Sequence, residues 1–387
     1  MIPAMQNPPV TRRRFLAASV LSIATLPQTR ADTFTAQLLE PIRTISHLSD
    51  RYHGWPTLAR QTNGQLLLAY SGGRQAHVCP FGRVEFMTSS DEGQSWSWPQ
   101  VIHDSPIDDR DAGILETKQG TLLATTFSSL AYEPLLERQS NWPEEKLTAW
   151  RAAHQRLNAT ERNALLGQWV IRSTDGGISW STAIRCPVNS PHGPIQLADG
   201  RLLYAGKELW TGQHRVGVCE SRDDGQTWTW LSEIPTRPND RASDYHELHA
   251  VETGDQRILV QIRNHNPTNE RETLQCESSD GGHTWTQPRS IGVWGLPSHL
   301  LKLRDQRLLM SYGYRRRPYG NQARISENHG RTWSDPITLS ADGPSGDLGY
   351  PSSVELADGS FLTVWYEKQA NHAVASLRQA HWQLPAG

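Results

Sequence analysis

Residues 278–285 read Ser-Ser-Asp-Gly-Gly-His-Thr-Trp, and the underlying pattern, Ser-x-Asp-x-Gly-x-x-Trp, occurs four more times in the chain. The other copies begin at Ser89, Ser173, Ser221 and Ser326, and the last has Asn328 in the Asp position. In such a pattern the Asp or Asn accepts hydrogen bonds from backbone N–H groups one and two residues on. Gly supplies the positive φ of a tight turn, and Trp covers neighbouring strands. The repeat therefore predicts five tight turns between β-strands.

A second repeat consists of a short apolar segment, a turn of the Asp-Gly type and another apolar segment. Its six turns are Asn63-Gly64, Gln119-Gly120, Asp199-Gly200, Asp255-Gln256, Asp305-Gln306 and Asp358-Gly359. The turn residues and the Leu, Val and Ile residues that flank them predict six β-hairpins. The chain is therefore expected to be all-β and built from six similar sheets.

The eight-residue pattern resembles the Asp-box, or BNR repeat, of the sialidase-like superfamily of β-propellers. This resemblance covers nearly all of residues 32–387 and implies a six-bladed β-propeller with four-stranded antiparallel blades. Each hairpin would form the inner strand pair of a blade, and each Asp-box would join the outer pair, away from the active face. Because there are only five boxes for six hairpins, we expect residues 35–45 to supply the last outer strand and close the ring.

The N-terminus, with Arg12-Arg13 before a short apolar run, has the features of a twin-arginine export signal over residues 1–31. The apolar run is too short to remain in a bilayer, so no membrane insertion of the mature chain is expected. We expect export of the folded protein to a bacterial periplasm or beyond. A disordered basic N-terminus is the alternative.

The formal net charge of −2 argues against nucleic acid or an anionic membrane as a partner, since both favour a basic stripe. No cofactor, metal site or protein partner is indicated. Cys219 and Cys276 occupy the same place in successive repeats, too far apart to bridge, so we expect them to be small buried residues.

One interval between Asp-boxes is longer than the others. The first two boxes start 84 residues apart, against 48, 57 and 48 for the next intervals. The extra chain, about residues 131–167, predicts a helical insertion between the second and third strands of blade two. Leu147, Trp150 and Leu157 predict an amphipathic helix, with Asn158 or Thr160 capping a shorter second one.

Alignment of the six hairpins on their turns locates the candidate site. In an up-and-down blade the innermost strand begins, and the second strand ends, on one face around the central channel. Eight places before the turn the chain has Trp55, Asp111, Pro191, Glu247, Pro297 and Tyr350. Eight places after it come Ser71, Phe127, Lys207, Arg263, Gly313 and Tyr366. Several ionisable residues lie beside this level, namely Arg110, His192, His246, His249 and His299.

Two segments resemble the catalytic segments of sialidases. The run from Tyr350 to Glu367 is similar to the one that carries their nucleophilic tyrosine and ends in a carboxylate that steadies an arginine. The run from Glu247 to Arg263 is similar to the one whose Glu activates that tyrosine and whose Arg binds the substrate carboxylate. A structural role is the alternative, with Tyr350 bonded to a backbone carbonyl and Glu247 paired with Arg263 across the hairpin.

The chain departs from that pattern in two places. The leading arginine of the sialidase triad is replaced by Gly54-Trp55-Pro56, so His53 or Arg51 would have to reach the site. The expected acid Asp is absent from residues 73–82, which leaves Asp111 or His77 as acid/base. The third arginine could be Arg315, Arg316, Arg317 or Arg324, and Arg317 is our assignment. Arg110, His246 and His299 complete the expected substrate contacts.

These residues predict an exo-acting, retaining glycoside hydrolase that removes a terminal acidic sugar from a glycan or oligosaccharide. A phenol with a pKa of ~10 is neutral at pH 7, so Glu247 would take the proton of Tyr350 as the bond to the sugar forms. Two alternatives remain: a polysaccharide lyase on the same fold, using His and Tyr, and a non-catalytic carbohydrate-binding propeller.

Overall fold

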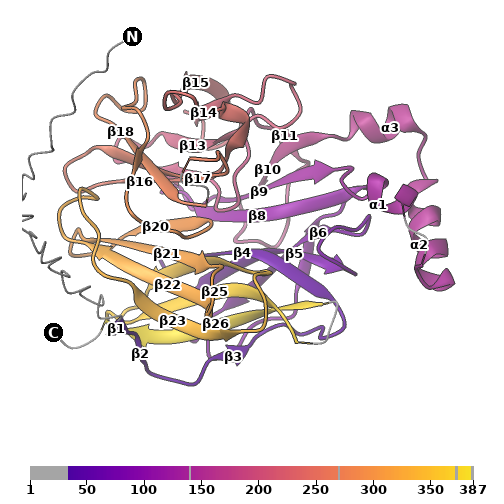
Figure 1. Ribbon diagram of the computed structural model, residues 1–387, viewed down its shortest axis with the longest axis horizontal. Coiled ribbons are helices and arrows are strands. Elements are labelled where there is room, and N and C mark those ends of the chain that lie inside the picture. The colour runs from indigo at the N-terminus through magenta and orange to yellow at the C-terminus, as the bar shows by residue number, and fades with distance from the viewer. Residues whose placement is uncertain (1–33, 139–140, 269–270, 371–373, 385–387) are drawn as a thin grey trace, which may run out of the picture. The chain divides into compact units, whose positions relative to one another are not determined.

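A computed structural model of the protein describes residues 34–138, 141–268, 271–370 and 374–384. The predicted export signal lies outside these residues. The described strands form six sheets, each containing four antiparallel strands in the order of a propeller blade (Figure 1). The six-bladed propeller with four-stranded blades is therefore confirmed.

Blades one to three follow one another along the chain. Blade one contains β4 (Tyr52–Arg60), β5 (Leu66–Arg74), β6 (Arg83–Ser89) and β7 (Gln100–His103). Blade two contains β8 (Asp108–Glu116), β9 (Leu122–Ser129), β10 (Gly167–Ser173) and β11 (Ile184–Arg185). Blade three contains β12 (Ile195–Gln196), β13 (Leu202–Lys207), β14 (Val216–Ser221) and β15 (Thr229–Glu233).

Blades four to six complete the ring. Blade four contains β16 (Tyr245–Glu252), β17 (Ile258–Asn264), β18 (Thr273–Ser278) and β19 (Arg289–Ser290), preceded by the short 3-10 helix Ala242–Asp244. Blade five contains β20 (Ser298–Lys302), β21 (Leu308–Tyr314), β22 (Tyr319–Ser326) and β23 (Ile337–Gly343). Blade six contains β24 (Leu348–Glu355), β25 (Phe361–Lys368) and β26 (Ala375–Gln383), with β2 (Gln37–Leu38) and β3 (Arg43–Thr44).

All six predicted hairpins form the inner strand pairs, from β4–β5 to β24–β25. In four of them the turn glycine has φ between 82° and 92°, as the left-handed turn position requires. Where Gly is replaced, Gln256 and Gln306 take φ of 64° and 73°. The turn geometry is therefore kept where the sequence signal is weaker.

The five Asp-boxes join the third and fourth strands of blades one to five, but their hydrogen bonds differ from our expectation. Asp280 Oδ1 accepts from the N–H groups of His283 (3.1 Å) and Thr284 (2.9 Å), three and four residues on rather than one and two. The N–H group two residues after Asp280, that of Gly282, donates instead to the hydroxyl of Ser278 at 2.9 Å. The side chains of Ser278 and Asp280 therefore both bind backbone N–H groups of the turn, and the turn is longer than the one we expected.

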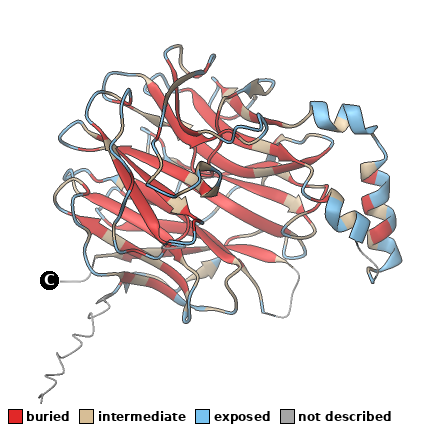
Figure 2. Cartoon of the chain, turned by 45° about the horizontal axis from the view of Figure 1, so that its top comes forward, coloured by how far each residue is buried: buried red, intermediate tan, exposed pale blue. Residues whose placement is uncertain are grey.

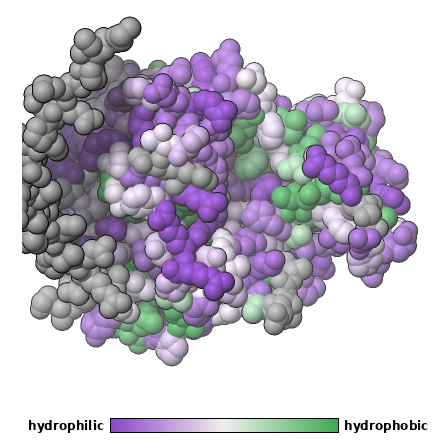
Figure 3. Space-filling model, viewed as in Figure 1, coloured by the Kyte–Doolittle hydropathy of each residue, from purple (hydrophilic) through white to green (hydrophobic). Residues whose placement is uncertain are grey.

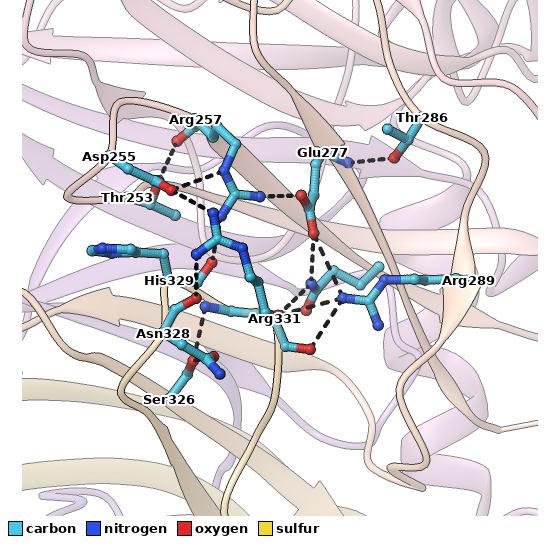
Figure 4. Close-up of polar contacts among 12 residues, drawn as sticks. Thr253, Asp255, Arg257, Glu277, Thr286, Arg289, Ser326, Asn328, His329 and Arg331 are labelled. Carbon is cyan, nitrogen blue, oxygen red and sulfur yellow. Dashed lines mark hydrogen bonds and ion pairs between the residues drawn. The ribbon is translucent and has the colours of Figure 1, made fainter.

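The Asp-box end also ties neighbouring blades together, as Figure 4 shows for blades four and five. Arg331, in the box of blade five, donates to Asp255 Oδ2 of blade four at 3.1 Å. Arg257 of blade four donates to the carbonyl of His329 at 3.2 Å and also binds Glu277. This end of the propeller is a structural rim.

The ring closes through the N-terminal segment, as predicted. β2 and β3 pair antiparallel with β26, with Leu38 opposite Trp382 and Thr44 opposite Arg378. An additional strand, β1 (Phe34–Thr35), pairs in parallel with β23 of blade five. The segment therefore bridges two blades, which the sequence did not indicate.

Three helices, α1 (Glu133–Arg138), α2 (Glu144–His154) and α3 (Ala159–Ala164), lie between β9 and β10. They project from one side of the propeller and are exposed over much of their surface, whereas the strands are mainly buried (Figures 1 and 2). Asn158 caps α3 in a capping box with Glu161. The sequence predicted two helices and missed α1.

Side chains from the insertion and from blade one share a small core. Trp150 and Tyr132 pack with Cys79 and Ile107. Figure 3 shows apolar surface where the helical insertion meets the propeller. Trp150 Nε1 donates to Gln75 Oε1 at 2.9 Å. The insertion therefore supports the loop of residues 75–82, which follows β5.

All four cysteines are free and buried, and the Sγ atoms of Cys186 and Cys219 lie 3.6 Å apart. Cys219 and Cys276 are small buried residues, as expected. Within the described ranges, no helix is long and apolar enough to cross a membrane.

Candidate active site

Four of the six aligned inner-strand positions have left-handed backbone conformations. Trp55, Asp111, Glu247 and Tyr350 have φ of 53°, 56°, 44° and 52°. Each lies where the register between the first and second strand of its blade shifts, which is the mark of a β-bulge. Bulges re-aim side chains, and a left-handed residue other than Gly costs about 1–3 kcal/mol, which is typical of functional sites. The other two positions are Pro191 and Pro297, whose rings fix a negative φ.

The bulges of blades four and six bring Glu247 and Tyr350 together, and we call Tyr350, Glu247 and Arg263 the tyrosine cluster. The Tyr350 hydroxyl donates to Glu247 Oε1 at 2.5 Å. Arg263 Nη1 donates to Glu247 Oε2 at 2.5 Å and to the Tyr350 hydroxyl at 3.3 Å. The three residues that resemble the sialidase catalytic set are therefore in direct contact.

Electrostatics in the cluster keep the carboxyl ionised and the phenol neutral. Burial alone would raise the pKa of Glu247, but the charge of Arg263 and hydrogen bonds from Arg263 and Tyr350 lower it to about 2. Burial, followed by the adjacent charge of Glu247, raises the pKa of Tyr350 well above its usual value. The phenol proton can therefore leave only as the oxygen forms a new bond.

Asp111, from blade two, faces the same cluster. Its side chain is buried, and burial together with the charge of Glu247 raises its pKa from 3.8 to about 7, against the opposing effect of Arg110. The Arg110 guanidinium lies 4.7 Å from the Trp55 ring centroid, and its buried Nε has no hydrogen-bond partner in the part of the chain that the structure describes. An acid that is half protonated near neutrality thus lies beside an arginine without a carboxylate partner.

A second cluster, which we call the Asp347 hub, consists of Asp347, Tyr52, His77 and Tyr366. Asp347 Oδ1 accepts from the hydroxyls of Tyr52 (2.9 Å) and Tyr366 (3.0 Å) and lies 3.1 Å from His77 Nδ1. The Tyr52 hydroxyl is 2.7 Å from the same His77 nitrogen. Burial would raise the pKa of Asp347, but these hydrogen bonds hold it at about 2. Burial lowers the pKa of His77, so its ring is neutral at pH 7.

Sequence reasoning missed Asp347 and Tyr52, although a signal was present. Both lie three places before a bulged residue, Tyr350 and Trp55 respectively, and Asp108 and Asp244 have the same offset in blades two and four. Asp108 makes a fully buried bidentate pair with Arg74, at 2.7 and 3.0 Å. Arg74 also donates to the carbonyl of His77 at 2.9 Å, so this pair fixes the loop that carries His77.

The third arginine near the cluster is Arg315, and the assignment of Arg317 is corrected. The Arg315 guanidinium lies 5.6 Å from the Tyr350 ring centroid and donates to the Tyr366 hydroxyl at 3.5 Å. Arg317 lies over the ring of Tyr319, with its guanidinium carbon 5.8 Å from the centroid. No described contact joins Arg317 to the cluster.

Comparison with known proteins identifies the family and the fold. The BNR repeat-like domain matches residues 134–363, more than half of the chain. The chain belongs to the BNR repeat-like family. A search of curated proteins gives no match for this BNR repeat-like protein.

Similar solved structures show that the propeller has the sialidase-like fold. A protein of unknown function from Dyadobacter fermentans has a TM-score of 0.73 and 22% identity, covering 90% of this chain and 99% of its own. The NanB sialidase of Streptococcus pneumoniae has a TM-score of 0.64 and 14% identity, covering 89% of this chain and 71% of its own. The sialidase of Trypanosoma rangeli has a TM-score of 0.59 and 16% identity, and the match spans 86% of this chain but only 55% of that one.

Two of the residues predicted for the site of this BNR repeat-like protein, Glu367 and His53, lie away from the tyrosine cluster. Glu367 pairs with Arg378 at 2.7 Å and accepts from Trp365 Nε1 at 3.2 Å, because alternation along β25 turns it to the face opposite Tyr366. His53 is buried against the Tyr70 ring, 5.3 Å between centroids, and burial lowers its pKa to about 4. Neither contacts the tyrosine cluster among the described residues.

The histidines occupy two separate places. His246 lies at the edge of the tyrosine cluster, 3.5 Å from Lys207 Nζ, and burial together with Lys207 lowers its pKa to about 4. His299 is buried with His192 and His249, with ring centroids 4.8–5.3 Å apart. This trio lines a cavity of about 350 Å³ that all six inner strands or their neighbours border. Across the described ranges, no group of His, Cys, Asp and Glu could hold a metal ion.

Proposed function

We propose that this protein is an exo-acting, retaining glycoside hydrolase in which Tyr350 is the nucleophile and Glu247 is its base. The observation that carries the proposal is the 2.5 Å hydrogen bond from the Tyr350 hydroxyl to Glu247 Oε1. A buried phenol bonded to an ionised carboxylate is the arrangement that a tyrosine nucleophile needs. Sialidases with a Tyr nucleophile are a recognised exception to the two-carboxylate mechanism.

The reaction would proceed in two steps. The Tyr350 oxygen attacks the anomeric carbon while Glu247 accepts the phenol proton, and the acid protonates the departing glycosidic oxygen. The ionised acid then removes a proton from water, which attacks the glycosyl-tyrosine bond, and Tyr350 regains its proton from Glu247. Because the pKa of Glu247 is lowered to about 2, Glu247 is already ionised in mildly acidic solution, and the pH dependence of the reaction near neutrality comes from the acid.

Asp111 is the acid that the electrostatics favour. Its pKa of about 7 leaves it largely protonated in mildly acidic solution, as the first step requires. His77 is neutral at pH 7, since its pKa is lowered, and its side chain is 47% exposed. We therefore assign His77 to a substrate hydroxyl and Asp111 to proton transfer.

An acidic terminal sugar fits the charges of the site. Arg263 is neutralised by Glu247, whereas Arg110 and Arg315 have no carboxylate partner among the described residues. Two such guanidiniums can hold a carboxylate through charge-assisted hydrogen bonds. Trp55 occupies the place of the leading sialidase arginine, so we do not restrict the acid to sialic acid. A glycan substrate outside the cytoplasm agrees with the predicted export signal.

The test is a panel of aryl glycosides of sialic, uronic and deoxy sugars assayed with the native protein and with Tyr350→Phe. We expect turnover of one acidic glycoside, lost in Tyr350→Phe with an unchanged melting temperature. Tyr312→Phe is the matched control, because its hydroxyl bonds Gln322 at 2.9 Å, away from the cluster. Undiminished turnover by Tyr350→Phe would refute the assignment, and glycan binding without turnover would identify a carbohydrate-binding propeller.

A polysaccharide lyase is the second candidate, and one observation favours it. Tyr52 and His77 form a direct pair at 2.7 Å, with the neutral ring half-exposed, as a lyase base and acid would be. A lyase would leave an unsaturated product that absorbs in the ultraviolet. It would lose activity in His77→Ala and retain activity in Tyr350→Phe.

A further inference from the structure

A cavity of about 410 Å³ is lined by the loop after β5, by residues just before β4 and by Arg156 of the helical insertion. We call it the arginine cavity, since Arg51, Arg83 and Arg156 line it together with Asp104, Gln75 and Phe81. The proposed mechanism uses none of these residues. They come from blade one, from the connection between β7 and β8, and from the chain after α2.

Two short segments of the chain lead from the lining of the cavity to the Asp347 hub. Arg51 directly precedes Tyr52, and Gln75 lies two residues before His77. Tyr52 and His77 both contact Asp347 in the hub. A glycan whose terminal sugar lies on the tyrosine cluster would therefore enter the arginine cavity after passing His77.

The charges of the cavity favour an acidic ligand. Arg83 is held by Glu85 at 2.8 Å, but Arg51 has only an exposed partner, Asp50, at 3.5 Å. Arg156 forms no ion pair within 4 Å among the described residues, and the carboxylate that feels its charge is Asp104. Exposed ion pairs contribute little binding energy, so the guanidinium groups of Arg51 and Arg156 remain available for a carboxylate of the ligand. The cavity itself contains one carboxylate, that of Asp104.

The remaining lining suits a sugar ring. Phe81 and Pro80 provide an apolar surface, while Ser105, Asp104 and Gln75 can bind hydroxyls. The hydrogen bond from Trp150 to Gln75 and that from Arg74 to the carbonyl of His77 hold the start of the loop, and Asp109 N–H donates to the carbonyl of Gly82 at its end at 3.0 Å. The cavity is therefore formed in advance, which reduces the entropy lost on binding.

We propose that the arginine cavity is a leaving-group subsite that binds the second sugar of a glycan when that sugar carries a carboxylate. The proposal rests on the proposed function for the placement of the terminal sugar. The charges of the two sites predict a substrate in which two consecutive sugars each carry a carboxylate. One sugar would occupy the tyrosine cluster while the next occupies the arginine cavity.

The test is isothermal titration with a glucuronic-acid tetrasaccharide and with a neutral glucose tetrasaccharide. The variant is Arg51→Gln/Arg156→Gln, and the matched control is Arg60→Gln/Lys302→Gln, which removes the same charge from exposed residues at the other cavity. We expect the acidic probe to bind at least about tenfold more weakly to the variant and within about twofold of native to the control. Tyr350→Phe should leave this affinity within about twofold of native.

Equal affinity of the variant and the control, or equal affinity of native protein for both tetrasaccharides, would overturn the subsite. Binding that depends on Arg51 and Arg156 without any hydrolysis would overturn the proposed function and leave the subsite standing. If hydrolysis occurs, the variant should raise KM for an acidic oligosaccharide about tenfold and leave kcat/KM for an aryl glycoside unchanged.

Discussion

Asp111→Asn is expected to change activity and stability in opposite directions. Asp111 has a folded pKa of about 7, raised from 3.8 mainly by burial and then by Glu247. At pH above 7 the native protein must keep a buried carboxylate ionised, which costs stability. Asn has nearly the same shape, tolerates the φ of 56° and carries no charge, so it removes this cost together with the proposed proton donor.

The magnitude follows from the difference between the folded and unfolded pKa. Because the folded pKa is raised, the stability linked to this proton is fully present below about pH 4 and is lost between about pH 4 and 7. The shift of about three units corresponds to at most about 4 kcal/mol. Asp111→Asn should therefore match the native protein at pH 4 and exceed its unfolding free energy at pH 8 by up to about 4 kcal/mol.

The measurements are urea unfolding at pH 4 to 8 and kcat/KM over the same range. The native kcat/KM should fall about tenfold per pH unit above pH 7, and Asp111→Asn should lose about 10²–10⁴-fold in rate and lack this limb. Glycosides with good leaving groups should be less affected. A variant that is less stable than native at pH 8, or that retains the alkaline limb, would refute the role and the burial argument together.

Three further predictions concern stability and the support of the site. Asp280→Ala should lower the unfolding free energy by about 0.5–1.5 kcal/mol at pH 7 without changing activity, and the loss should vanish as acid protonates the native carboxyl, whose pKa of about 2 reflects bonds from Thr284. Arg74→Met should cost about 3–5 kcal/mol in urea unfolding because it leaves Asp108 as an unpaired buried charge, and Arg74→Met/Asp108→Leu should recover most of it. Trp150→Ala should lower the free energy of local unfolding around the insertion by about 3–5 kcal/mol and speed amide exchange in residues 75–82. The kcat/KM should fall because this loop becomes more mobile. Exchange protection equal to that of the native protein would contradict the supporting role of the insertion.

The fold could be predicted from the sequence because its signals are local. An Asp-Gly turn or an Asp-box specifies its hairpin within about eight residues, and their repetition fixed the number of blades. β1 could not be found in this way, because a two-residue parallel pairing with β23 leaves no periodic pattern. The helix α1 was missed because its six residues bury no side chain fully.

The spatial grouping of the candidate residues was predictable for the positions that the repeat alignment covers, and not for the others. Glu247, Asp111 and Tyr350 share one position in the hairpin, so aligning the turns was enough to place them on one face. Asp347 lies on the same face of the propeller, but its hydrogen bond with Tyr52 joins residues that are hundreds of positions apart in the sequence. The sequence could not show that Arg315, and not Arg317, lies near Tyr350, because this depends on where each side chain of the loop points.

The pairing of β2 and β3 with β26 has a consequence for how the polypeptide can be rearranged. Blade six takes its outer edge from residues 37–44 and its other strands from residues 348–383, so the first and last parts of the chain act as a clasp. Joining them covalently and opening the backbone at an exposed turn such as Asp305-Gln306 would preserve every sheet. Such a circular permutant would keep every strand pairing and every contact between blades, because these depend on the order of the blades around the axis and not on which blade comes first in the chain.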